Sequence, residues 1–116
     1  MRDFKQLKVW QKAYRLVLDT YRNARGFPAE ERYAITAHLL KSATSVPSNI
    51  AEGCGRRTDT ELAHFLGIAA GSASETEYQL LLARDLGYLA ESDYQDLDNQ
   101  ANEVKRMLNA FIQKLT

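Results

Sequence analysis

The stretch Ser45-Val46-Pro47-Ser48-Asn49-Ile50-Ala51-Glu52-Gly53 decides how the chain folds, because it closes one helical segment and leads into a turn. Pro47 has no amide hydrogen, so it kinks or breaks any helix that passes through it. Ile50 stays in phase with the apolar residues before the proline, which favours a kink over an end. Gly53 and Gly55 then allow backbone angles that other residues avoid, so a turn is expected after them.

Outward from this stretch, apolar residues recur at steps of three and four in four segments, which is typical of helices packed side by side. The first predicted helix starts near Asp3, which forms an approximate capping pair with Gln6. Its predicted inward residues are Leu7, Trp10, Tyr14, Val17, Tyr21 and Ala24. The inward residues of the second helix are Ile35, Leu39, Ala43, Val46 and Ile50.

The third and fourth predicted helices each follow a capping signal. Thr58-Asp59-Thr60-Glu61 is a capping box, and Ser92-Asp93-Tyr94-Gln95 resembles a second one. The predicted inward residues of the third helix, which Gly87 ends, are Leu62, Leu66, Ala69, Ala73, Thr76, Leu80 and Ala83. Those of the fourth helix are Leu97, Ala101, Val104, Leu108, Phe111 and Leu115.

These segments predict an all-α fold. The connections between them are short, so neighbouring helices are expected to be antiparallel. The prediction is therefore an antiparallel up-down-up-down four-helix bundle with a kinked second helix, formed as a single domain by residues 1–116.

The third predicted helix is apolar nearly all round, so it should be buried on more than one side. A membrane span is excluded, because His64, Glu75, Glu77 and Gln79 interrupt the apolar run. Glycine inside a helix costs about 1 kcal/mol relative to alanine, so two of them need a reason such as close backbone approach. The sequence therefore predicts a homo-oligomer interface at Ala63, Gly67, Gly71 and Ser74.

The formal net charge is zero, but residues 1–58 carry +6 and residues 59–116 carry −6. Such asymmetry marks either a nucleic-acid face or complementary surfaces between subunits. A basic stripe about 25 Å long is predicted opposite the apolar side of the first helix. With two arginines at the turn, the candidate phosphate contacts are Lys5, Lys8, Lys12, Arg15, Arg22, Arg56 and Arg57. Asp19 interrupts the stripe, and an ordinary solvated helix face is the alternative.

Catalytic and metal signals are weak. Di-iron bundles need two Glu-x-x-His pairs, and here only Glu61 and His64 form one, with His38 unsupported. No metal, cofactor or catalytic residue is therefore expected. Cys54 is the single cysteine, so no intrachain disulfide forms and a reducing cytoplasm fits.

The structural motif is assigned to five residues of the quoted stretch, namely Ser45, Pro47, Asn49, Glu52 and Gly53. Pro47 leaves a carbonyl without its donor one turn earlier, and the amide of Asn49 is a candidate to satisfy stray backbone groups there. Glu52 is expected to pair with Arg56 or Arg57. A binding pocket at Asn49 and Glu52 is the less favoured reading.

The quoted stretch also resembles the signature of the bacterial four helix bundle family, also called the 23S rRNA-intervening sequence proteins. Further matching patches are Leu7-Lys8-Val9-Trp10-Gln11-Lys12-Ala13, Phe65-Leu66-Gly67-Ile68-Ala69-Ala70-Gly71-Ser72 and Leu86-Gly87-Tyr88-Leu89. The resemblance implies a four-helix bundle that is similar to ring-forming homopentamers. A related group, the accessory proteins of diversity-generating retroelements, implies contact with nucleic acid and a reverse transcriptase.

The leading functional hypothesis is a non-enzymatic, cytoplasmic homo-oligomer that associates with nucleic acid, RNA in particular, through the first helix. The second hypothesis is an oligomeric adaptor or scaffold whose partner is another protein. The third is a metalloenzyme, which elemental analysis of the purified protein would test.

Overall fold

The computed structural model describes residues 2–116, and within them the chain forms four long helices and two short 3-10 helices without a strand. The long helices are α1 (Lys8–Ala24), α2 (Ile35–Cys54), α3 (Asp59–Asp85) and α4 (Glu91–Leu115). The short ones are η1 (Phe4–Gln6) and η2 (Ala29–Glu31). The predicted all-α four-helix bundle is confirmed.

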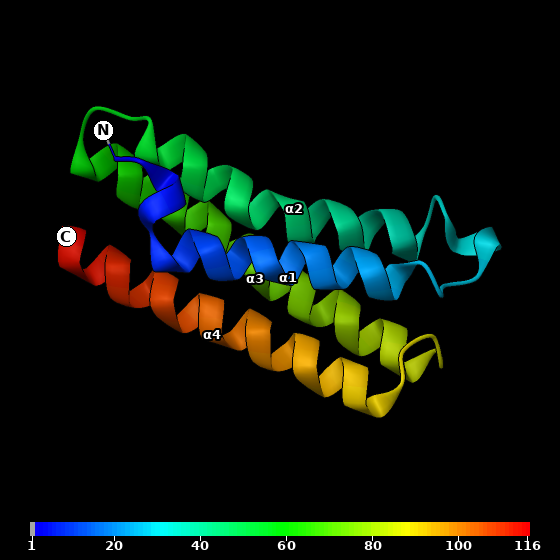
Figure 1. Ribbon diagram of the computed structural model, residues 1–116. Coiled ribbons are helices and arrows are strands. Elements are labelled where there is room, and N and C mark those ends of the chain that lie inside the picture. Colours follow the sequence, from blue (N-terminus) through cyan, green and yellow to red (C-terminus); the bar gives the residue numbers. More distant parts are fainter. Residues whose placement is uncertain (1) are drawn as a thin grey trace.

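The four helices are arranged so that α1 and α3 are diagonal to each other. α1 packs on α2 and α4, and α3 packs on the same two helices. Figure 1 shows both chain ends and the turn between α2 and α3 at one end of the bundle. The bundle measures 43 × 23 × 20 Å. In this described part of the chain, no helix is long and apolar enough to cross a membrane.

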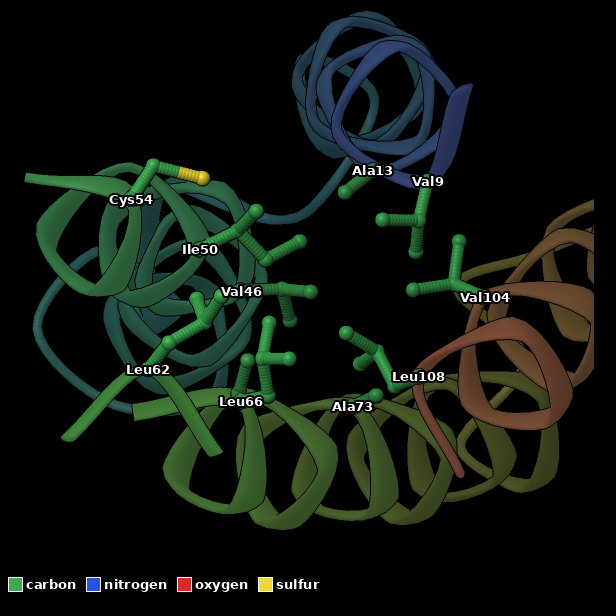
Figure 2. Packing of buried hydrophobic residues seen from close by; sticks show 11 residues of the cluster. Val9, Ala13, Val46, Ile50, Cys54, Leu62, Leu66, Ala73, Val104 and Leu108 are labelled. Carbon is green, nitrogen blue, oxygen red and sulfur yellow. The ribbon is translucent and has the colours of Figure 1, made fainter. Parts of the chain in front are cut away.

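The core follows the predicted inward residues of α2, α3 and α4. Leu66, Leu80, Leu97 and Leu108 are all fully buried. Figure 2 shows Val46, Leu66, Val104 and Leu108 directed toward one another from three helices. Thr76 and Ser42 are the buried polar residues between α2 and α3.

The predicted orientation of α1 is wrong in part, because Val17 and Ala24 are buried as expected but Tyr14 and Tyr21 are not. Tyr14 and Tyr21 were expected inside, yet 47% and 45% of their surfaces are exposed. The inward residues are Val9, Ala13, Leu16, Val17, Thr20 and Ala24. Small residues such as Ala13 and Thr20 let α1 pack closely, and the large aromatic rings lie on a second, outward apolar face.

The predicted ends of α3 agree with the structure, whereas the predicted starts of α1 and α4 do not. Thr58 caps α3 as predicted, its hydroxyl accepting the Glu61 amide at 3.1 Å. Gly87 has a φ of 82° and ends α3 in the left-handed conformation. Two capping predictions are wrong. The first long helix does not start near Asp3, because Leu7 is extended and α1 starts only at Lys8, so Asp3 caps η1 instead. α4 starts at Glu91, so the Ser92 signal lies inside that helix.

α2 runs unbroken from Ile35 to Cys54 with Pro47 inside it, and the kink itself stays a prediction. Neither Gly53 nor Gly55 has a positive φ, contrary to expectation. Gly53 is needed for a different reason. A Cβ there would lie 3.0 Å from both Leu62 Cδ1 and Phe65 Cβ, so the missing side chain lets α2 approach α3.

Candidate nucleic-acid interface

The cations of α1 line a surface groove that runs between α1 and α4. The groove has a volume of about 460 Å³. Its lining residues are Lys8, Gln11, Lys12, Arg15, Asp96, Gln100 and Glu103. The α1 wall of the groove is therefore basic and the α4 wall is acidic. The basic stripe predicted on the first helix did not indicate this acidic wall.

Carboxylates already engage several of these cations. Lys12 Nζ lies 3.0 Å from Glu103 Oε1 across the groove. Asp19, only 15% exposed, lies between Arg22 at 2.7 Å and Arg15 at 3.5 Å. Such partly exposed pairs add little stability, but they lower the positive potential that a phosphate would meet.

The remaining predicted phosphate contacts lie toward the bundle end that carries the N-terminus. Arg56 pairs with Glu52 at 2.9 Å, as predicted, and its guanidinium lies 4.7 Å from the centre of the Phe65 ring. Within residues 2–116, Lys5, Lys8 and Arg57 have no carboxylate within 4.0 Å. Lys5 belongs to η1 rather than to α1.

The quoted motif forms a line of hydrogen bonds between α2 and α3. Asn49 Nδ2 donates to the carbonyl of Ser45 at 2.8 Å and to its hydroxyl at 3.0 Å. The Ser45 hydroxyl lies 2.7 Å from that of Ser72 on α3. Deeper in the interface, Thr76 Oγ1 donates to Ser42 Oγ at 3.1 Å.

These bonds give Asn49 a structural role, but it does not satisfy the carbonyl that Pro47 leaves without a donor. Its amide reaches the carbonyl of Ser45, whereas Pro47 leaves the carbonyl of Ala43 without its helical donor. Sequence reasoning missed Ser72 as the partner of Ser45 and Thr76 as the partner of Ser42. The available signal was a half-buried serine and a buried threonine four residues apart on one helix, because hydroxyls removed from water need hydrogen bonds.

The structure gives the candidate chemical groups ordinary surroundings. No cluster of three or more His, Cys, Asp or Glu side chains suited to a metal occurs among the described residues. His64 is exposed and makes an edge contact with Phe65 at 5.3 Å. Burial raises the pKa of Cys54, which is 1% exposed, so its thiolate is scarce at neutral pH.

The outward face of α3 carries the residues predicted to form an oligomer interface. Ala63 is half-buried, while Gly67, Gly71 and Ser74 are exposed. A Cβ built on Gly67 or Gly71 would meet nothing within 4 Å, so contacts inside the protomer do not explain either glycine. Tyr78 continues this face and is 57% exposed.

α1 carries a second outward apolar face that sequence reasoning did not separate from the inner one. It consists of Trp10, Tyr14, Leu18 and Tyr21, which we call the outer seam of α1. Trp10 and Tyr14 stack with ring centres 5.0 Å apart. Leu18 is 39% exposed. A search for two parallel series of three-and-four steps would have found it.

A charged cluster spans α3 and α4. Lys105 Nζ lies 2.6 Å from Glu77 Oε1. Burial, followed by repulsion from Glu77, raises the pKa of the neighbouring Asp98 carboxyl. The cluster is half-buried, so these charges affect the stability of the fold.

The fold and motif define a helical-bundle protein with polar bonds between α2 and α3 and two unpartnered outer faces. The chain belongs to the 23S rRNA-intervening sequence protein family, whose model matches residues 5–110. It is similar to a crystal structure of a Bacteroides thetaiotaomicron protein of unknown function from the S23 ribosomal protein family. The identity is 25%, with 90% of this chain and 97% of the other covered and a TM-score of 0.83. Comparison with curated proteins gave no match.

Proposed function

We propose that this chain is a non-enzymatic, cytoplasmic homo-oligomer that associates with nucleic acid, RNA in particular. The observation that carries the proposal is the row of Lys8, Lys12 and Arg15 along one open groove. The groove lies on the α4 side of α1, whereas the outer seam and the α3 face are separate surfaces. Phosphate contact and assembly can therefore occur together.

The assembly is supported by matching shapes on opposite sides of the bundle. The outer seam advances in steps of four, four and three residues, and so do Ala63, Gly67, Gly71 and Ser74. Large side chains of one protomer thus match small residues of the next. Because α1 and α3 are diagonal, these faces point in opposite directions and the contact is head-to-tail. Head-to-tail contacts close into a ring when each subunit is rotated relative to the next, and a ring of five subunits is what the family resemblance implies.

The assembly test compares Gly71→Trp with the wild-type protein by light scattering after gel filtration. A tryptophan on this open helix face would leave the protomer folded, because apart from the neighbouring backbone of α3 itself nothing lies within 4 Å of the new Cβ. We expect the ring to dissociate into folded protomers. A variant that keeps the wild-type mass would contradict the α3 interface.

In such a ring the groove would recur once per subunit, and weak phosphate contacts would add up through multivalency. The affinity should depend on salt, because each neutralised phosphate releases counterions. If only Lys5, Lys8 and Arg57 contribute, the slope of log K against log salt is about −2 per subunit for single strands. A contribution from all seven candidate cations would give about −5.

The binding test is a titration of the purified oligomer with structured RNA and duplex DNA at low and physiological salt. Reversing Lys8, Lys12 and Arg15 to Glu should remove most binding. Lys41→Glu is the control, since Lys41 is exposed on α2 outside the groove. Absence of binding at low salt, or equal losses in both variants, would contradict the proposal.

The second candidate is an oligomeric protein-binding adaptor without nucleic-acid contact. It is favoured by the ion pairs, since four of the seven candidate cations already have carboxylate partners. A reverse transcriptase is the partner that the family resemblance suggests. Under this alternative the three charge reversals on α1 would leave binding of the partner protein unchanged.

A further inference from the structure

A second groove lies where the start of α1 meets the end of α4, and we call it the end groove. Its volume is about 360 Å³, within the usual range for small-ligand sites. Its apolar lining residues are Leu7, Val9, Met107, Ala110 and Phe111. Lys8 on α1 and Lys114 on α4 complete the lining. Val9 is a core residue beneath the groove, and Figure 2 shows its side chain directed into the core.

The two lysines make the end groove positively charged. Neither has a carboxylate within 4.0 Å in the described part of the chain. Lys8 also sits in the first turn of α1, which has no acidic residue and no side-chain cap. A cation at the positive end of a helix dipole is unfavourable unless an anion compensates it.

The floor between the lysines suits a flat apolar body. Phe111 is half-buried, and the Arg2 guanidinium lies 5.5 Å from the centre of its ring. Met107 supplies a soft, adaptable surface beside it. A nucleotide combines a flat base with a phosphate, so it matches both the floor and the lysines. In a duplex the bases are stacked inside, and only an unpaired base can lie on such a surface.

We infer that the end groove binds one unpaired nucleotide of a single strand, with the base on the floor and the phosphate between Lys8 and Lys114. The inference rests on the proposed nucleic-acid association and names its substrate class. It also adds Lys114 and Phe111 to the interface, which the α1 stripe did not include.

The test uses the full-length oligomer and fluorescence anisotropy with three labelled ligands of equal length. These are an unstructured RNA strand, the same backbone without bases, and an RNA duplex. The wild-type protein should bind the base-bearing strand about tenfold more tightly than the abasic one, as expected for stacking of a base. Abasic and base-bearing strands carry the same phosphates, so simple electrostatic attraction predicts equal binding.

Two variants place the effect in the end groove. Ala110→Phe fills the floor and should abolish the preference for the base-bearing strand. Lys114→Glu should weaken binding of that strand about tenfold and of the duplex much less. Arg106→Glu is the matched control, because it makes the same charge change on an exposed residue of α4 outside this groove. Circular dichroism and gel filtration verify that each variant is folded and assembled.

The outcomes separate this inference from the proposed function. No binding of any ligand at low salt would overturn both. Equal wild-type affinity for abasic and base-bearing strands, with binding still lost on reversing Lys8, Lys12 and Arg15, would overturn the inference alone. The same holds if Ala110→Phe keeps the base preference, since the floor would then not hold the base.

Discussion

Replacing Gly53 by alanine should destabilise the fold of the protomer, whereas the same change at Gly67 should stabilise that fold. Both glycines lie in helices, so both substitutions gain from the higher helix propensity of alanine, up to about 1 kcal/mol. They differ in their surroundings and in the smaller propensity gain at Gly53, which lies in the last turn of α2. The comparison therefore tests the contact between the end of α2 and α3.

At Gly53 the new Cβ would lie 3.0 Å from Leu62 Cδ1, 3.0 Å from Phe65 Cβ and 3.3 Å from the Leu62 carbonyl oxygen. The leucine methyl can move, but the Phe65 Cβ and the carbonyl are fixed by α3. Overpacking of this kind costs about 1–3 kcal/mol. The gain in propensity is reduced because Gly53 lies in the last turn of α2. We expect a net loss of about 1–2 kcal/mol.

At Gly67 the new Cβ would meet nothing within 4 Å, so only the propensity term remains. We expect a gain of about 0.5–1 kcal/mol. For a chain of this size the two variants should differ in melting temperature by several degrees, about 4 °C or more per kcal/mol. Thermal and urea unfolding at two protein concentrations would measure this and reveal any contribution from assembly.

A Gly53→Ala protein that melts as high as Gly67→Ala would refute the packing argument, because it would show that α2 and α3 separate without cost. A second outcome concerns Gly67→Ala, whose melting temperature could fall below that of the wild-type protein, and fall further on dilution. It would show that alanine disturbs contacts between protomers on the α3 face.

Three further predictions follow from the interior. Asp98→Asn should raise the melting temperature at neutral pH, because burial and Glu77 raise the pKa of Asp98 and so disfavour its charged form in the fold. This gain should shrink as pH falls through the raised pKa and vanish below the usual aspartate value of about 3.9; a gain independent of pH would contradict it. Thr76→Val should cost about 1 kcal/mol in urea unfolding, because it breaks the bond to Ser42; an unchanged midpoint would show that this bond contributes nothing. Cys54 should react with a thiol reagent only as fast as the protein opens, since the residue is 1% exposed and burial also raises the pKa of its thiol; rapid labelling of the native protein would contradict this.

The sequence predicted α3 well because that helix has one inward series. Leu66, Ala73 and Leu80 are small or medium residues in a single register, and all are buried as expected. The start of α3 was also correct, because a capping box acts within four residues of the chain. Local signals of this kind need no knowledge of neighbouring helices.

α1 could not be predicted in the same way because it has two apolar series. Its outer seam contains the larger side chains, and hydrophobic size alone favours Tyr14 over Ala13 as the inward residue. Only the packing distance to α2 and α4 selects Ala13, and that distance is a property of the assembled bundle. The ion pair from Lys12 to Glu103 was hidden for the same reason, because it joins residues that are distant in sequence.

The two apolar seams also explain why the α1 stripe is partly neutralised. They occupy so much of the circumference of α1 that its charged residues share one narrow strip. Asp19 lies in that strip between Arg15 and Arg22, and Glu103 faces it from α4. A strip confined in this way cannot keep its cations apart from carboxylates. Positive potential therefore concentrates at the start of α1, where Lys8 has no partner among residues 2–116, and this is where an incoming phosphate should bind first.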